Sequence, residues 1–184
     1  MVPLASLWLP ILLSAVVVFI SSSLLHMVLK YHGTDFATVP NEDAVLDALR
    51  PNPPGDYMLP RPASREQMKD PAFQEKMKRG VAVLTIMRGD PQASFKKALA
   101  LWFVYSLVVS VFAAYIAGRA LRPGTEYAEV FRFIGTTAFL GYSLAMAQQS
   151  IWYAKKWSTT VKSMFDGLIY AMLTAVIFGW LWPK

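Results

Sequence analysis

Three ionisable side chains lie inside or at the edge of long apolar stretches and are the first candidates for chemistry: His26, Arg132 and Asp166. A charged group in the hydrocarbon of a bilayer is costly, so such residues are functional candidates by default. His26 lies one turn before Lys30, and Asp166 lies about one turn inside the last apolar stretch. We therefore expect both at the same depth on the same side of a membrane, where a histidine–aspartate contact can pass protons or hold the polar group of a quinone or lipid.

Two further polar residues, Gln148 and Gln149, are expected near the same level. A structural interpretation competes with the functional one, because Lys162 and Asp166 are four residues apart and can pair on their own helix. A histidine near the membrane interface also often does no more than reach for water. Both interpretations stay open at this point.

A metal site is not expected from the sequence. His26 and His32 are the only histidines, and at six residues apart they do not share a helix face. Asp35, Glu42 and Asp43 add oxygen ligands, but neither a zinc nor a di-iron spacing results. The chain has no cysteine, which excludes thiolate sites. Two histidines without a matching spacing make a haem unexpected, and no phosphate loop, dinucleotide turn or nucleophile elbow is present. We expect no cofactor and no catalytic residue.

The composition is that of a membrane protein. Of the 184 residues, 55% are hydrophobic and only 16% are charged, whereas a soluble domain carries roughly 25% charged residues. The net charge of +6 comes from basic residues beside the apolar stretches, where topology and lipid head groups explain it better than nucleic acid does. No basic recognition element accompanies the charge, so we expect a lipid bilayer as partner and no nucleic acid.

The predicted fold is an all-α membrane protein with four transmembrane helices in a bundle. Residues 1–29 contain no Lys, Arg, Asp or Glu. This uncharged stretch is longer than the roughly 20 apolar residues that a helix needs to cross a bilayer. The basic start and cleavage site of a secretory signal are missing, so this stretch is expected to be a retained span. A region over 98–184 supplies the other spans, expected at about 98–118, 131–154 and 160–182.

The intervening region 30–97 is polar and is expected outside the membrane. Asn41 and Asp70 are suitable N-cap residues, and proline or glycine follows each helical pattern. A β-branched run follows the second helix and predicts a strand, with a two-stranded ribbon as its simplest pairing. The expected elements are helices near 41–50 and 71–79 and strands at 56–59 and 81–87.

Small residues recur every fourth position in three spans, a pattern that lets membrane helices approach closely. The rows are Ser106, Ser110, Ala114 and Gly118; Thr137, Gly141 and Ala145, continued by Gln149; and Ser163, Gly167, Ala171, Ala175 and Gly179. A row at intervals of four drifts by about 40° per step around a helix, so one straight neighbour cannot follow it. We expect crossed helix pairs, or one helix serving two neighbours, with a protein partner or a second copy of the chain as an alternative occupant.

The distribution of basic residues favours one orientation. Counted near the span ends, the side of the 30–97 region has seven Lys or Arg and the opposite side has four. An excess of positive charge marks the cytoplasmic side. We expect the 30–97 region in the cytoplasm and both termini outside.

Several stretches resemble a group of uncharacterised bacterial multi-span membrane proteins, described only as hypothetical. The stretches are Trp8-Leu-Pro-Ile-Leu-Leu-Ser-Ala, Ser-Ser-Leu-Leu-His26-Met, Pro40-Asn-Glu-Asp-Ala, Pro54-Gly-Asp-Tyr57-Met, Ser150-Ile-Trp-Tyr and Phe178-Gly-Trp-Leu-Trp-Pro183. The resemblance implies a small multi-span protein of the bacterial cytoplasmic (inner) membrane. It implies no activity, and no catalytic residue transfers from it.

Three functions are compatible with these features. The leading expectation is a structural or accessory subunit, or a scaffold, in a membrane complex. The alternative is a small transporter or a proton or ion pathway through the level of His26, Gln148 and Asp166, although the internal repeat common in transporters is not evident. The third is a membrane oxidoreductase or lipid-modifying enzyme that uses His26, His32 and Asp35.

Overall fold

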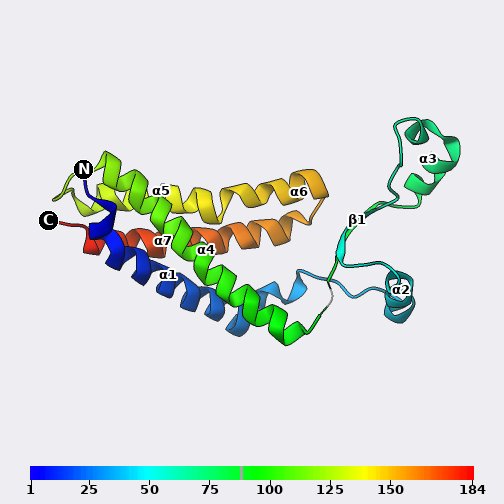
Figure 1. The fold of residues 1–184 in the computed structure, drawn as a ribbon, viewed down its shortest axis with the longest axis horizontal. Coiled ribbons are helices and arrows are strands. Elements are labelled where there is room, and N and C mark those ends of the chain that lie inside the picture. Colours follow the sequence, from blue (N-terminus) through cyan, green and yellow to red (C-terminus); the bar gives the residue numbers. More distant parts are fainter. Residues whose placement is uncertain (88) are drawn as a thin grey trace. The chain divides into compact units, whose positions relative to one another are not determined.

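The computed structural model describes residues 1–87 and 89–184. It divides into two compact units, one formed by Met1–Phe36 with Phe95–Lys184 and the other by Ala37–Ser94. Four helical segments are long and apolar enough to cross a membrane: Leu4–Val28, Gln92–Ala120, Tyr127–Tyr153 and Trp157–Leu181. Together with a small two-stranded sheet, these segments confirm the predicted all-α bundle with a short ribbon (Figure 1).

The first segment lies within the expected 1–29 stretch, and the bounds of the other three differ from the approximate ones expected. The second starts at Gln92 rather than 98, the third covers Tyr127–Tyr153 rather than 131–154, and the fourth covers Trp157–Leu181 rather than 160–182. Helical hydrogen bonding does not stop where the apolar run stops. Lysine side chains can lie along a helix end and keep their charge in water, so helix continues past Lys96 and Lys97.

Two of the segments are not regular helices throughout. The first consists of a 3-10 turn at Leu4–Leu7, α1 at Trp8–Ser23 and a π-helical segment at Leu24–Val28. The third consists of α5 at Tyr127–Tyr142, a 3-10 turn at Leu144–Met146 and α6 at Ala147–Tyr153. The other two are continuous: α4 at Pro91–Ala120 and α7 at Trp157–Leu181.

The break in the third segment falls at Ser143, whose backbone leaves the helical region at φ −127° and ψ −59°. Its hydroxyl donates a 2.8 Å hydrogen bond to the carbonyl oxygen of Met164 on α7. The break therefore has a fixed partner on the neighbouring helix.

The small-residue row of α7 packs antiparallel along this broken segment. A Cβ added to Gly167 would lie 2.8 Å from the Ser143 Cβ, and a Cβ added to Gly135 would lie 3.3 Å from the Cβ of Ala175. Gly179 similarly faces the Tyr127 ring. Three members of the row, Gly167, Ala175 and Gly179, thus face this one segment. Since α7 also packs against α1, it serves two neighbours, which is the second of the two expected arrangements.

The row of α4 is buried at all four of its positions and packs against the first segment. Ser110 and Ser14 face one another with their hydroxyl oxygens 3.2 Å apart. The Val2 amide donates to the carbonyl oxygen of Gly118 at 2.7 Å, and at the same end of the bundle the Gly124 amide donates to the carbonyl oxygen of Pro183 at 2.8 Å. The buried members are Ser106, Ser110, Ala114 and Gly118.

The row of the third segment differs from the prediction. Thr137 and Gly141 are half-buried, while Ala145 and Gln149 are exposed. The buried face of α5 lies one position away, whereas Gly141 packs closely against Val109 of α4 and, with Ala145, lines a cavity. The members of this buried face are Val130, Ile134, Ala138 and Tyr142.

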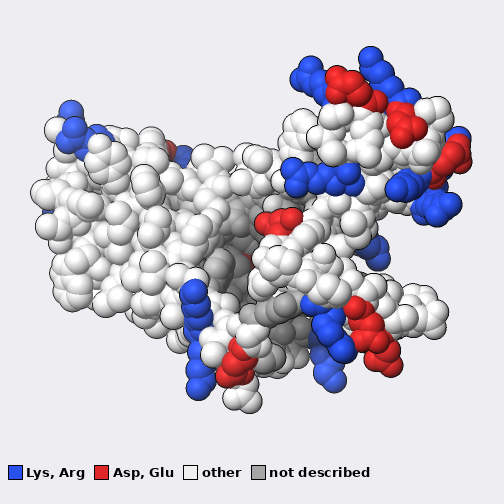
Figure 2. Space-filling view, turned by 45° about the vertical axis from the view of Figure 1, so that its right-hand side comes forward, with Lys and Arg blue, Asp and Glu red and all other residues white. Residues whose placement is uncertain are grey.

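The Ala37–Ser94 unit contains α2 at Glu42–Leu49, α3 at Pro71–Lys78 and an antiparallel pair, β1 at Gly55–Leu59 and β2 at Ala82–Ile86. The Asp70 carboxylate accepts from the Ala72 amide at 2.9 Å and caps α3. Asn41 forms no such bond, because its backbone is left-handed at φ 55°. Lys, Arg, Asp and Glu gather on this unit, whereas the visible face of the helices is almost free of them (Figure 2).

The close packing at Gly167 gives a first test. The Gly167→Ala variant places a methyl group 2.8 Å from both the Ser143 Cβ and the Tyr142 carbonyl oxygen, so backbone must move. Overpacking of this kind costs roughly 1–3 kcal/mol, and the midpoint of thermal unfolding in detergent should fall. The matched control is Gly33→Ala, where an added Cβ has nothing within 4 Å. Equal midpoints for the two variants would contradict the described packing.

Candidate functional site

Side chains from the end of the first span, the turn that follows it and the N-terminal half of α7 meet in one cluster. His32 Nε2 lies 2.8 Å from Oδ2 of Asp166, and His26 Nε2 lies 3.7 Å from the same oxygen. The two imidazole rings stack with centroids 4.5 Å apart and planes 28° apart. The expected meeting of His26 and Asp166 at one level is therefore present, with His32 as a third member.

A second layer of contacts holds His32 in place. Its Nδ1 lies 2.6 Å from Oδ2 of Asp35, and the other Asp35 oxygen lies 3.0 Å from the Lys162 ammonium. Lys162 also donates to the Tyr31 carbonyl oxygen at 2.6 Å and to the Thr34 hydroxyl at 3.1 Å. The hydrogen bond from His32, aided by the Lys162 ammonium and opposed by partial desolvation, lowers the pKa of Asp35.

Lys162 does not form the expected pair with Asp166 on its own helix. Its ammonium instead bonds to the 31–35 segment, because that turn offers a carboxylate, a hydroxyl and a carbonyl oxygen together. Asp166 lies one turn further along α7 and faces the histidines. Lys162 and Asp166, one helical turn apart on α7, thus both bind side chains or carbonyl groups of the turn at residues 31–35.

The local backbone explains how two histidines six residues apart come together. A continuous helix would separate their side chains around its axis. The backbone becomes extended at Leu29, with φ −83° and ψ 120°, which ends the span. The chain then turns through the 3-10 segment Lys30–Thr34 and brings His32 back onto His26.

The His32 ring lies between two carboxylates, and a neutral imidazole has too few N–H groups to donate to both. Both ring nitrogens face a carboxylate oxygen, yet a neutral imidazole carries only one N–H. The contact between Nε2 and Asp166 therefore requires a further proton or another cation. The Asp166 side chain is 3% exposed, and its Oδ1 has no hydrogen-bond partner among the described residues. Leaving a buried acceptor unsatisfied costs roughly 1–3 kcal/mol.

A cavity of about 630 Å³ lies beside this cluster, bordered by the first span, α4, the broken third span and α7. Trp102 forms part of its aromatic wall and donates to the Ser22 hydroxyl at 2.8 Å. The polar residues that line the cavity are Ser22, Ser23, His26, Gln149, Lys155, Ser163 and Asp166; the aromatic ones are Phe95, Trp102, Tyr105, Tyr142 and Tyr170. A site with apolar walls and a few converging polar groups is typical of small-ligand binding.

The remaining candidates divide between this cavity and other places. Gln149 lines the cavity, as do Gly141 and Ala145 of the third row, whereas Gln148 is exposed and does not join the cluster. Arg132 lies elsewhere, 69% exposed and bonded at 2.6 Å to Glu129.

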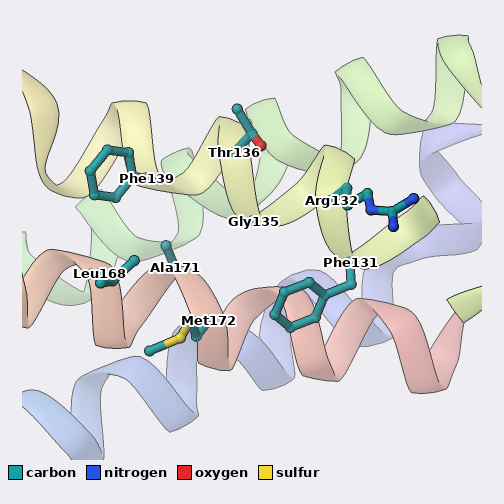
Figure 3. A pocket seen from close by; sticks show the side chains of 8 residues that line it. All are labelled: Phe131, Arg132, Gly135, Thr136, Phe139, Leu168, Ala171 and Met172. Carbon is teal, nitrogen blue, oxygen red and sulfur yellow. The ribbon is translucent and has the colours of Figure 1, made fainter. Parts of the chain in front are cut away.

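Arg132 borders a second, smaller pocket of about 300 Å³ between α5 and α7. Its guanidinium points away from Leu168 and Met172 (Figure 3). The other lining side chains are almost all apolar, so this pocket offers few groups that could bind or react with a polar ligand.

Sequence reasoning missed the aromatic wall. It named His32, Asp35 and Lys162 as candidates, but it did not predict the contact between Lys162 and Asp35. Trp102 and Tyr170 read as ordinary interface or core residues, and no local pattern links them to a site. One signal was available for the second layer, because Asp35 follows His32 by three residues and can contact it within one turn.

Comparisons with family models, curated proteins and solved structures find no match to the chain. Function is therefore inferred from the geometry of this site alone.

The bonds of Lys162 give a second test. The Lys162→Met variant removes three contacts to the turn at residues 31–35. Hydrogen bonds to charged groups contribute roughly 1.5–3 kcal/mol, so amide hydrogen exchange in this turn should accelerate by at least about ten-fold. Hydrogen–deuterium exchange with mass spectrometry measures the change, with the exposed Lys155→Met as control. Unchanged exchange in the 30–36 segment of Lys162→Met would show that the tether is not formed.

Proposed function

We propose that the chain is a small multi-pass membrane protein that admits a polar or ionic solute to the cavity between its helices, as a transport protein. The His26, His32 and Asp166 cluster is the binding site within that cavity. The observation that carries the proposal is the nearly fully buried Asp166 carboxylate beside a cavity of about 630 Å³, with one oxygen that has no hydrogen-bond partner within residues 1–87 and 89–184.

The cost of burying the Asp166 carboxylate favours a ligand site over a purely structural role. A buried charge pair often stabilises a fold no more than apolar residues of the same volume would. A scaffold or accessory subunit could pack these helices with leucine and alanine alone. The buried carboxylate and the two histidines beside it therefore support a role in binding.

The irregular backbone at the cavity supports the same proposal. Broken helices mark substrate sites in many transporters, because freed backbone groups and side chains can face a solute there. The π-helical segment Leu24–Val28 and the break at Ser143 both lie at the cavity. An inverted repeat is not evident in the sequence, so the likeness to transporters is limited to this local feature.

We place the protein in the bacterial cytoplasmic membrane, following the resemblance of the sequence. The exposed side chains on the spans support a lipid environment, because they are large and apolar at positions such as Ile20, Leu140 and Phe165, each more than half exposed. The excess of Lys and Arg near the span ends supports a cytoplasmic 30–97 region with both termini outside.

Cysteine accessibility tests whether the cavity admits water-borne solutes. The natural chain has no cysteine, so single variants need no background correction. Ala145 lines the cavity, whereas its neighbour Leu144 is 49% exposed and is not among the lining residues. A water-soluble maleimide should modify Ala145→Cys in membranes and leave Leu144→Cys unmodified, because a thiol ionises and reacts in water but not in hydrocarbon.

Equal reactivity of these two cysteines, or an inert Ala145→Cys, would contradict an open cavity. A denatured sample of each variant, which should react fully, controls for the intrinsic reactivity of the thiol.

The orientation has its own test. An impermeant maleimide added to spheroplasts should label Ala120→Cys, at the end of α4, and spare Ala63→Cys in the 37–94 unit, because only the former faces outward. Both side chains are exposed. Labelling of Ala63→Cys with Ala120→Cys protected would reverse the orientation.

A further inference from the structure

We propose that His26 Nε2, His32 Nε2 and the Asp166 carboxylate form a binding site for one divalent transition-metal ion, such as Zn²⁺. This inference rests on the proposed function, since it names the chemical class of the solute that the cavity admits. The metal was not expected from the sequence because the histidines are six residues apart. The turn after Leu29 removes that objection.

The three ligand atoms are close enough to share one ion. They lie within 4.8 Å of one another, and two of the separations are 2.8 and 3.7 Å. Metal–ligand bonds of about 2.0–2.2 Å place two ligand atoms roughly 3–3.5 Å apart. Because the two imidazole rings are stacked, binding of one ion requires a ring to rotate until both nitrogens point at it. His26 is the ring to rotate, since its side chain is 49% exposed.

An unsatisfied contact and an unpartnered atom both lie in this cluster. His32 Nε2 faces Asp166 although its own Nδ1 faces Asp35, and a neutral imidazole cannot donate to both. A second ring proton would satisfy both contacts, and so would a cation at Nε2, which leaves the single N–H on Nδ1 to donate to Asp35. The cation would also compensate the buried Asp166 carboxylate, whose Oδ1 has no hydrogen-bond partner among the described residues.

The surroundings of His32 are those of a metal ligand. Histidines bound to metals commonly donate their other ring N–H to a carboxylate, which fixes the tautomer and the ring orientation. Asp35 occupies that place at 2.6 Å and is itself held by Lys162 at 3.0 Å. Asp35 is thus a positioning residue and not a ligand.

The type of ligand narrows the type of ion. Two imidazoles and one carboxylate suit zinc and other first-row transition ions, whereas magnesium and calcium prefer oxygen ligands. Three protein ligands leave at least one position open. His26 and Asp166 both line the cavity, so that position can be filled by water or by a solute from it.

Zinc binding to the full-length protein tests the inference. Protein purified in detergent and stripped with a chelator should take up one Zn²⁺ per chain, measured by elemental analysis after gel filtration. The His32→Ala and Asp166→Asn variants should lose this stoichiometric zinc. Asp35→Asn should bind about 10–100-fold more weakly, as loss of an outer carboxylate typically does. Gln148→Ala, exposed and outside the cluster, should bind like the natural protein.

A milder variant guards against loss of fold. The His26 side chain is 49% exposed, so His26→Gln should fold normally and still lose the zinc. Co²⁺ gives an independent readout, because its visible ligand-field bands should appear with the natural protein and be absent with His26→Gln. A natural protein that retains no zinc, or His26→Gln and His32→Ala variants that bind zinc normally, would overturn the metal site.

The outcomes also separate this inference from the proposed function. Reactive Ala145→Cys without zinc binding would leave the open cavity standing and remove the metal. Zinc binding with an inert Ala145→Cys, and no Zn²⁺ uptake into proteoliposomes, would support the metal site and remove transport.

Discussion

Burial of the Asp166 carboxylate among apolar helices is the constraint on which the site depends. A carboxylate out of water needs hydrogen bonds or a cation, because burial of an unpaired charge is among the most costly events in folding. Its own helix does not supply a partner, since Lys162 turns to the 31–35 segment. The partners come from the end of the first span and the turn beyond it, so one carboxylate organises a segment more than a hundred residues away in sequence.

The contacts of Asp166 are part of a chain of polar contacts that extends to the turn of residues 31–35. His32 is fixed by two carboxylates, Asp35 by His32 and Lys162, and the turn of residues 31–35 by Lys162. Each contact satisfies one group and positions the next. Networks of this kind are effective only when every member is satisfied. In the part of the chain that the structure describes, Oδ1 of Asp166 is the carboxylate oxygen of this network that has no hydrogen-bond partner.

The regular part of this architecture follows from sequence periodicity. Runs without charge longer than a bilayer predict the spans, and the four-residue row of α7 correctly marks a tightly packed face at Gly167 and Ala175. The shared level of His26 and Asp166 also follows, because depth along a helix depends only on residue count.

The irregular part could not be obtained in this way. Spacing arguments assume a continuous helix, and they separate His26 from His32 because the extended residue Leu29 is invisible to them. The third row is close-packed only in part. Gly141 lies against Val109, but Ala145 follows the break at Ser143 and is exposed beside the cavity, because small residues permit close packing but do not require it.

The two ends of the bundle are held by different kinds of bond. At the end that carries the termini, main-chain hydrogen bonds join Val2 to Gly118 and Gly124 to Pro183. The strength of such main-chain hydrogen bonds depends little on ion concentration and is not changed by most side-chain replacements. At the other end, imidazoles, carboxylates and one ammonium hold the helices, and contacts between charged groups weaken as the salt concentration rises. We therefore expect a change in ionic strength to loosen this end of the bundle before the end that carries the termini.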